Sequence, residues 1–160
     1  MVKMDSAINK LRVRAQSESG FTLVELLVVM LILGLLAAIA IPAFFNQRAK
    51  AQDAEAKSTA KTAQTAMETY ATDAGGSYAG ATKTLLDNIE PTLPDATSGA
   101  GSYSLTYRSP TTYRITVISD SGTGFSITRE AHGTLNQYCS AGGQGGCPDD
   151  ATAGGVGVWD

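Results

Sequence analysis

The hydrophobic pattern of the chain is dominated by one uncharged run near the N-terminus. Residues Leu26 to Phe45, LLVVMLILGLLAAIAIPAFF, contain no charged side chain. At ~1.5 Å per residue, this run forms about 30 Å of helix, which matches the hydrocarbon thickness of a bilayer. The pattern therefore predicts a membrane-spanning helix over residues 26–45.

Beyond the span the pattern becomes one-sided. Small and apolar residues recur at intervals of three, four or seven, with charged residues between them, and Gly75-Gly76 supplies a helix stop. The spacing predicts that the same helix continues as an amphipathic helix to about Ala74. Asp53 and Lys57 are spaced for a surface ion pair worth a few tenths of a kcal/mol. The predicted apolar stripe consists of Ala49, Ala56, Ala60, Ala63, Met67, Tyr70 and Ala74.

The C-terminal part changes to a period of two. A short helix is expected over residues 84–89, and alternating apolar residues then predict strands around residues 103–107, 113–117, 125–127 and 134–138. Turn residues separate the strands, which indicates an antiparallel meander with one apolar face. The alanine stripe is the surface available to cover that face. The predicted fold class is α+β, a long N-terminal helix packed on a four-stranded antiparallel sheet.

Charge is distributed unevenly around the span. The whole chain has a formal net charge of −3, but removing residues 1–20 leaves 12 − 4 = 8 basic and 15 − 2 = 13 acidic side chains, or about −5. This balance does not indicate nucleic-acid binding. Four basic residues precede the span and three lie in the first fifteen after it, so the positive-inside rule favours a cytoplasmic N-terminus only weakly.

Two cysteines, Cys139 and Cys147, lie near the C-terminus. We interpret them as one disulfide, with a loop-entropy contribution of roughly 2.5 kcal/mol and an oxidising compartment for this part of the chain. Two unpaired thiols are the alternative. A metal site would need more ligands than this pair and the single histidine, His132, supply, so no metal is expected.

The junction before the span differs from an ordinary secretory signal, which is cut after its apolar region and therefore lost. Here the sequence Gly20-Phe21-Thr22-Leu23-Val24-Glu25 closes a polar leader and opens directly into the span. This stretch resembles the prepilin signature shared by type IV pilins and type II secretion pseudopilins. The resemblance covers residues 19–74 well and the remainder only as a pilin-like architecture.

The resemblance implies a processing reaction at Gly20. In that family a membrane aspartyl peptidase cuts after the glycine and N-methylates the new first residue, which implies cleavage between Gly20 and Phe21 and methylation of Phe21. The chain is then a substrate and not an enzyme. Its leader of 20 residues is longer than is usual before a mature N-terminal Phe, and Met4 is an alternative start.

Glu25 is the one carboxylate at the edge of the span. Placing it there costs about 2.5–3.5 kcal/mol on insertion scales, so a partner is expected. The resemblance implies that Glu25 pairs with the N-terminal amine of a neighbouring subunit, at Phe21, during assembly. The alternative is a glutamate at headgroup level that water solvates.

Gly34 and Pro42 are the expected weak points of the helix. Proline lacks an N–H and crowds the preceding turn, while Gly34 lowers helix propensity by about 1 kcal/mol relative to alanine. The resemblance implies that residues 35–41 can lose helical form in a filament. Alternatively, Gly34 is a small residue at a helix contact and Pro42 a tolerated membrane kink.

The sequence organisation is therefore a leader over residues 1–20, a helix over 21–74, a connecting loop over 75–102, and a sheet region over 103–160. Ser140 to Gly146 is interpreted as a flexible loop, His132 as a turn residue, and the strand tyrosines as packing residues. The C-terminal acids give only a weak calcium pattern and are expected to be solvated; they are Asp149, Asp150 and Asp160.

The resemblance implies a structural subunit without a cofactor, expected to be the major pilin of a type IV pilus. The implied partners are further copies of the chain, a prepilin peptidase and N-methyltransferase, an inner-membrane platform, its ATPase, and the lipid bilayer before assembly. The subunit would lie in the bacterial cytoplasmic membrane, N-terminus inside, and then in the surface pilus. Two alternatives are a pseudopilin of a type II secretion or competence DNA-uptake system, and a single-pass exported binding protein.

Overall fold

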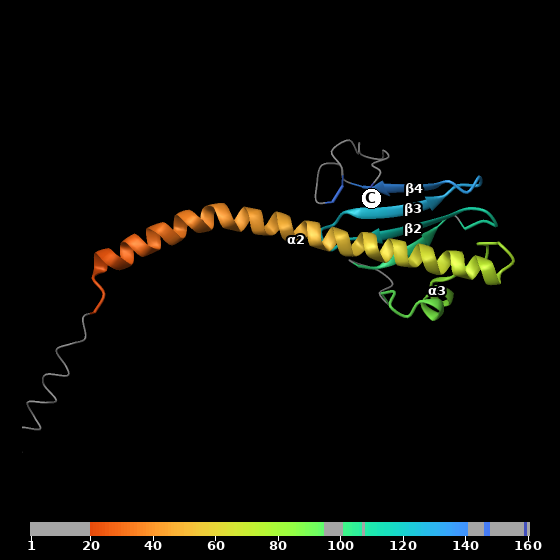
Figure 1. Ribbon diagram of the computed structural model, residues 1–160, viewed down its shortest axis with the longest axis horizontal. Coiled ribbons are helices and arrows are strands. Elements are labelled where there is room, and N and C mark those ends of the chain that lie inside the picture. Colours follow the sequence, from red (N-terminus) through yellow and green to blue (C-terminus); the bar gives the residue numbers. More distant parts are fainter. Residues whose placement is uncertain (1–19, 95–100, 107, 141–145, 148–158, 160) are drawn as a thin grey trace, which may run out of the picture. The chain divides into compact units, whose positions relative to one another are not determined.

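The structure is a computed structural model that describes residues 20–94, 101–106, 108–140, 146–147 and 159. The leader, apart from Gly20, lies outside the described residues. The chain divides into two compact units, residues 1–43 and 44–160, and each is described by itself. The elements run in the order α2 (Leu23–Asp73), α3 (Lys83–Ile89), β1 (Tyr103–Thr106), β2 (Tyr113–Ile118), β3 (Gly124–Arg129) and β4 (Leu135–Cys139) (Figure 1).

Helix α2 has 51 residues and contains Pro42 in its interior. It ends where two consecutive glycines adopt positive φ, 65° at Gly75 and 88° at Gly76. The amide of Gly76 donates to the carbonyl of Ala71 at 2.7 Å, the bond that closes a Schellman motif and satisfies an otherwise unpaired carbonyl at the helix end. The predicted glycine stop is therefore the observed one.

Within the first unit, the helix presents its large apolar side chains to the outside. Met30 is 73% and Leu31 is 74% exposed. Among the described residues, α2 is the one helix long and apolar enough to cross a membrane, and its most apolar window of 18 residues has no buried member. A surface of this kind needs a nonaqueous environment or other helices to cover it.

The second unit contains an antiparallel sheet in the order β1-β2-β3-β4. Tyr103, Val117, Phe125 and Cys139 form one row of paired positions across all four strands. Along β2, Tyr113, Ile115 and Val117 are buried and the residues between them are not. The predicted meander with one apolar face is therefore confirmed.

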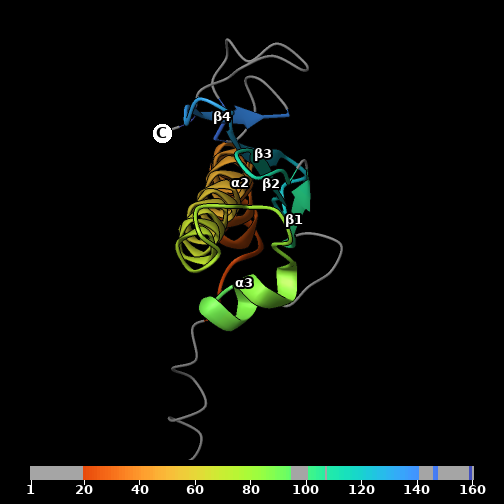
Figure 2. The same cartoon turned by 90° about the vertical axis from the view of Figure 1, so that its right-hand side faces the viewer.

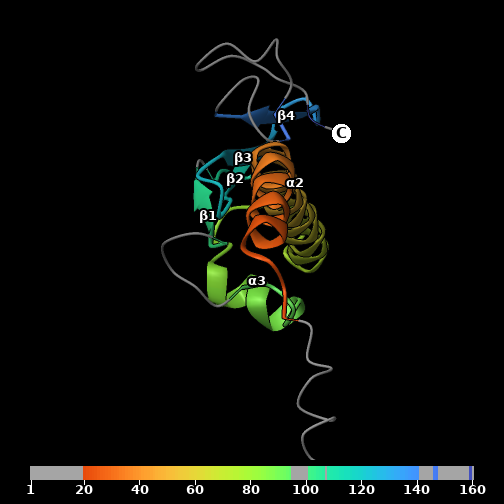
Figure 3. The same ribbon diagram turned by 90° about the vertical axis from the view of Figure 1, so that its left-hand side faces the viewer.

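The part of α2 within the second unit covers the apolar face of the sheet, as Figures 2 and 3 show from the two sides. Ala60, Ala63 and Met67 have no exposed surface, and Ala56 is 4% exposed. Alanines allow the helix backbone to approach the larger strand residues closely, so the predicted stripe is the packing surface. Three of its predicted members are only partly buried, namely Ala49, Tyr70 and Ala74.

Helix α3 lies beside the β1 edge of the sheet (Figure 2). The side chain of Thr82 caps it by accepting from the amide of Leu85 at 3.3 Å. The hydroxyl of Tyr103 on β1 donates to Asp87 at 2.5 Å, and the Lys83 ammonium lies 4.4 Å from the Tyr103 ring centroid. These contacts attach α3 to the sheet.

Candidate functional site

The predicted processing junction lies immediately outside the helix. Gly20, Phe21 and Thr22 have no helical assignment, and all three are exposed. The Thr22 hydroxyl accepts a hydrogen bond from the Glu25 amide at 3.2 Å, and the Glu25 carboxylate lies 3.5 Å from the Thr22 amide, a long hydrogen bond in return. This reciprocal arrangement is a capping box, which satisfies free N–H groups at a helix start.

Glu25 is exposed in the first turn of α2. A carboxylate there also interacts favourably with the positive end of the helix dipole. Its amide and carboxylate are hydrogen-bonded to Thr22, and the structure holds one chain, so its pairing with a neighbouring amine stays a prediction.

The two predicted weak points both lie in the first unit. A Cβ placed on Gly34 would have no atom within 4 Å outside its own helix turn, so within one chain nothing requires a glycine there. Pro42 lies inside the continuous helix. The proposed loss of helix over residues 35–41 concerns a filament and stays a prediction.

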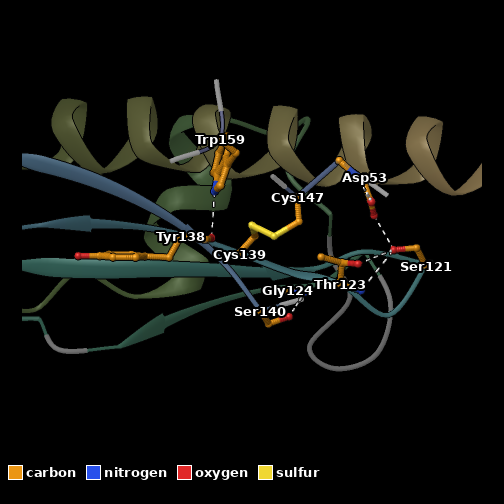
Figure 4. Close-up of a disulfide and its surroundings, with 10 residues drawn as sticks. Asp53, Ser121, Thr123, Gly124, Tyr138, Cys139, Ser140, Cys147 and Trp159 are labelled. Atoms are coloured by element: carbon orange, nitrogen blue, oxygen red, sulfur yellow. Dashed lines mark hydrogen bonds between the residues drawn. A yellow bond between two sulfur atoms is a disulfide. The ribbon is translucent and has the colours of Figure 1, made fainter. Parts of the chain in front are cut away.

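In the second unit, Cys139 and Cys147 form the predicted disulfide, with their Cα atoms 5.9 Å apart. Figure 4 shows it between the end of β4 and α2. Next to it, the Ser140 hydroxyl accepts from the Gly124 amide at 2.7 Å. Of the predicted loop 140–146, residues 141–145 lie outside the described residues.

The structure contradicts the predicted surface ion pair between Asp53 and Lys57. The Asp53 side chain has no exposed surface and forms no ion pair with Lys57 among the described salt bridges. Instead the carboxylate accepts from the Ser121 hydroxyl at 2.5 Å and from the Gly146 amide at 2.7 Å (Figure 4). Burial of the carboxylate is tolerated because both oxygens have donors, and these donors join α2 to the β2–β3 turn and to the disulfide loop.

The Lys57 side chain packs over aromatic rings. Its ammonium lies 5.5 Å from the ring centroids of both Phe125 and Trp159, within range of a cation–π attraction. Trp159 is 1% exposed and donates from Nε1 to the carbonyl of Tyr138 at 2.9 Å (Figure 4). A residue next to the C-terminus is therefore part of the core of the second unit.

Glu68 is the centre of a second polar cluster between α2 and the sheet. Its carboxylate accepts from the hydroxyls of Tyr78 at 2.6 Å and Tyr113 at 2.7 Å, and pairs with Arg129 at 3.0 Å. Burial, followed by the hydrogen bond to Glu68, raises the pKa of Tyr78 to about 12 and also raises the pKa of Tyr113. Both hydroxyls therefore stay protonated as donors, and Tyr113 packs and hydrogen-bonds as predicted for the strand tyrosines.

Candidate chemistry is sparse in the described part of the chain. His132 is exposed in the turn between β3 and β4, the position predicted for it. No group of three or more His, Cys, Asp or Glu that could hold a metal occurs within the described ranges. The weak calcium pattern of Asp149, Asp150 and Asp160 lies outside them.

The comparisons with known proteins match part of the chain. The family described as "Prokaryotic N-terminal methylation motif" matches residues 16–41. The type IV major pilin protein PilA of Myxococcus xanthus is 47% identical over 51 residues, which are 32% of this chain and 23% of that protein. A type IV major fimbrial protein FimA of Dichelobacter nodosus is 38% identical over 98 residues, 58% of this chain and 63% of that protein.

A third relative is the fimbrial protein EcpC of Eikenella corrodens, 43% identical over 60 residues, 38% of this chain and 39% of that protein. The chain thus spans less than two thirds of the length of each of these relatives. No solved structure gives a significant match.

The fold and the junction define a class of protein, a membrane-anchored α+β subunit with a prepilin-type N-terminus. The methylation motif at residues 16–41 and the similarity to pilin and fimbrial proteins support the predicted resemblance to the type IV pilin family.

Three features of these sites were not predicted from the sequence. The pattern Thr22-Leu-Val-Glu25 before an apolar run is the signature of a capping box and could have been recognised. Asp53 and Glu68 gave no such signal, because their donors are 68 and 45 residues away in the sequence at Ser121 and Tyr113.

Proposed function

We propose that the chain is a major pilin, the repeating structural subunit of a type IV pilus. The observation that carries the proposal is the junction itself, where Gly20 and Phe21 lie outside the helix and Glu25 lies in its first turn, within the matched methylation motif. The names of the relatives, major pilin and major fimbrial protein, support the same assignment. A pilin is a structural protein, so no enzymatic activity is proposed.

In this proposal a prepilin peptidase and N-methyltransferase cuts between Gly20 and Phe21 and methylates the amine of Phe21. The subunit waits in the cytoplasmic membrane with its N-terminus inside, and the apolar surface of residues 26–45 lies in the bilayer. An inner-membrane platform with its ATPase then moves subunits into a surface filament. There the apolar side chains exchange lipid for other copies of the same helix, which requires no exposure to water.

In this proposal Glu25 aligns each subunit with its neighbour during assembly. Cleavage creates a positive amine at Phe21, and an exposed carboxylate in the first helical turn can pair with the amine of a neighbouring subunit. Away from water such a pair is strong, because each charge without its partner is costly in hydrocarbon.

The first test is the N-terminus of the mature protein. Mass spectrometry of sheared surface material should identify a chain that begins at methylated Phe21. A mature chain that retains residues 1–20 would contradict the processing step.

The second test is assembly. Glu25→Ala should insert into the membrane and lose filaments, whereas Glu55→Ala, which changes an exposed glutamate of α2 in the second unit, should keep them. Electron microscopy with immunolabelling reads out both variants. Long labelled surface fibres of the wild-type protein support a pilus, and short or absent wild-type fibres with normal processing support a pseudopilin. Normal fibres from Glu25→Ala contradict the assigned role of Glu25.

A further inference from the structure

We propose that Thr22 is a positioning residue for leader removal. Its capping box makes α2 begin at Leu23, so that the bond between Gly20 and Phe21 stays outside the helix. This inference rests on the proposed function, since it concerns the same processing step. It assigns a role in that step to a residue on the far side of the scissile bond from the leader.

The boundary of α2 is sharply placed relative to the scissile bond. Gly20, Phe21 and Thr22 are non-helical, and the first helical residue is Leu23. The Thr22 hydroxyl accepts from the Glu25 amide at 3.2 Å, and the Thr22 amide faces the Glu25 carboxylate at 3.5 Å. Both bonds exist only when Thr22 is the N-cap, since the capping residue itself has non-helical backbone angles.

A peptidase needs the scissile peptide outside a helix. In a helix the carbonyl of the scissile peptide is bonded to an amide four residues on, and the surrounding side chains enclose it. In a non-helical segment the carbonyl of Gly20 and the amide of Phe21 are free to bind to an enzyme. The exposure of Gly20 and Phe21 in the structure meets this requirement.

Without the capping box, little prevents the helix from including the junction. Leu23, Glu25 and the following leucines are good helix formers, and by residue type the next N-cap upstream in the sequence is Ser19. A helix that began after Ser19 would contain both Gly20 and Phe21. Glycine opposes this extension by its low helix propensity, and Thr22 opposes it by offering a better start.

The capping box also holds Glu25 next to the place where the new amine appears. The Glu25 carboxylate faces the amide of Thr22, which is the residue next to Phe21 in the chain. Before cleavage this contact satisfies a free amide, and after cleavage the carboxylate is available to the charged amine of a neighbouring subunit, a stronger partner. The same side chain therefore serves the precursor and the mature subunit in turn.

The experiment uses the full-length precursor in detergent micelles, with membranes that contain its prepilin peptidase, and follows loss of the leader by mass spectrometry. Thr22→Val keeps the shape but removes the hydroxyl, and should slow cleavage roughly fivefold, the factor that corresponds to a cap worth ~1 kcal/mol. Thr22→Ser keeps the hydroxyl and should be cut at close to the wild-type rate. The matched control is Thr65→Val, which changes an exposed threonine inside α2.

A spectroscopic readout separates this role from direct recognition of Thr22 by the enzyme. The Cα chemical shift of Phe21 in the labelled precursor should be non-helical in wild type and Thr22→Ser, and should move toward the helical value in Thr22→Val. Equal cleavage of all variants, or slow cleavage of Thr22→Val with an unchanged Phe21 shift, would overturn the inference. A wild-type precursor that is not cut after Gly20 would overturn the proposed function instead.

Discussion

Asp53 on α2, whose side chain has no exposed surface, accepts a hydrogen bond of 2.5 Å from Ser121 in the β2–β3 turn of the second unit. The other carboxylate oxygen accepts from the Gly146 amide at 2.7 Å. A single acid thus connects the long helix, a strand turn and the disulfide loop.

Replacing this acid should destabilise the second unit. Asp53→Ala leaves the Ser121 hydroxyl and the Gly146 amide without their acceptor, so we expect a loss of about 3 kcal/mol in the free energy of unfolding. The measurement is urea denaturation of the full-length protein in detergent micelles, followed by circular dichroism. Asp120→Ala, which removes an exposed acid of the same turn, should change stability by less than about 0.5 kcal/mol. A loss as large in Asp120→Ala would contradict the specific role of Asp53.

The disulfide should act together with Asp53. Replacing both Cys139 and Cys147 by serine should lower the free energy of unfolding by roughly 2.5 kcal/mol through the entropy of the opened loop. Because the Gly146 donor is adjacent to Cys147, the loss from Asp53→Ala should be smaller once the disulfide is absent. A double-mutant cycle measures this coupling, and strictly additive losses would show that the loop reaches Asp53 without the disulfide.

Trp159 should report on the integrity of the second unit, because it is the only tryptophan of the chain and is buried. Trp159→Ala should cost about 3 kcal/mol, as for other large aromatic side chains removed from a core. Trp159→Phe keeps an aromatic ring near Lys57 but loses the bond to the Tyr138 carbonyl, so its loss should be smaller. In the wild type, tryptophan emission should shift to longer wavelength in the same urea transition that circular dichroism detects. An emission maximum typical of exposed tryptophan before unfolding would contradict the burial.

The Glu68 cluster predicts loss of stability at alkaline pH. In the folded state the pKa of Tyr78 is raised to about 12 from about 10, and that of Tyr113 is also raised. A raised pKa means that the folded state favours the protonated hydroxyl, so its contribution is complete below pH 10 and is lost as pH rises through 12. The free energy of unfolding should therefore fall above pH 10.

The check is a tyrosinate titration alongside denaturation curves at each pH. Part of the tyrosinate absorbance should appear only with unfolding. Tyr78→Phe and Tyr113→Phe should be less stable at neutral pH, since each removes a bond to Glu68, and should also show a shallower alkaline loss. If the free energy of unfolding of both variants falls with pH as steeply as that of the wild type, these two hydroxyls are excluded as the cause.

The sequence was sufficient wherever the fold depends on local periodicity. The apolar run, the alanine stripe, the alternation in the strands and Gly75-Gly76 each determine an element or its end without reference to distant residues. The cysteine pair is also local, since only eight positions separate its members.

Distant partners explain what the sequence did not reveal. Asp53 fell on the expected polar face by spacing, and only the docking of the β2–β3 turn makes it a buried acceptor. Trp159 likewise packs against Phe125, a contact that no periodicity encodes. Single buried polar and aromatic contacts of this kind depend on how elements dock, whereas patterns along the chain report only which faces are apolar.

Gly34 offers a test of the proposed weak segment over residues 35–41. A Cβ at this position lies within 4 Å of none of the described atoms outside its own helix turn, and alanine favours helix by about 1 kcal/mol over glycine. Gly34→Ala should therefore leave membrane insertion, leader removal and the stability of the second unit unchanged. Its effect should appear only in filaments, as a higher force for extension in single-fibre pulling measurements. Filaments of unchanged extensibility would show that Gly34 does not weaken the helix, and failure to form filaments would indicate that the position is instead a close helix contact between subunits.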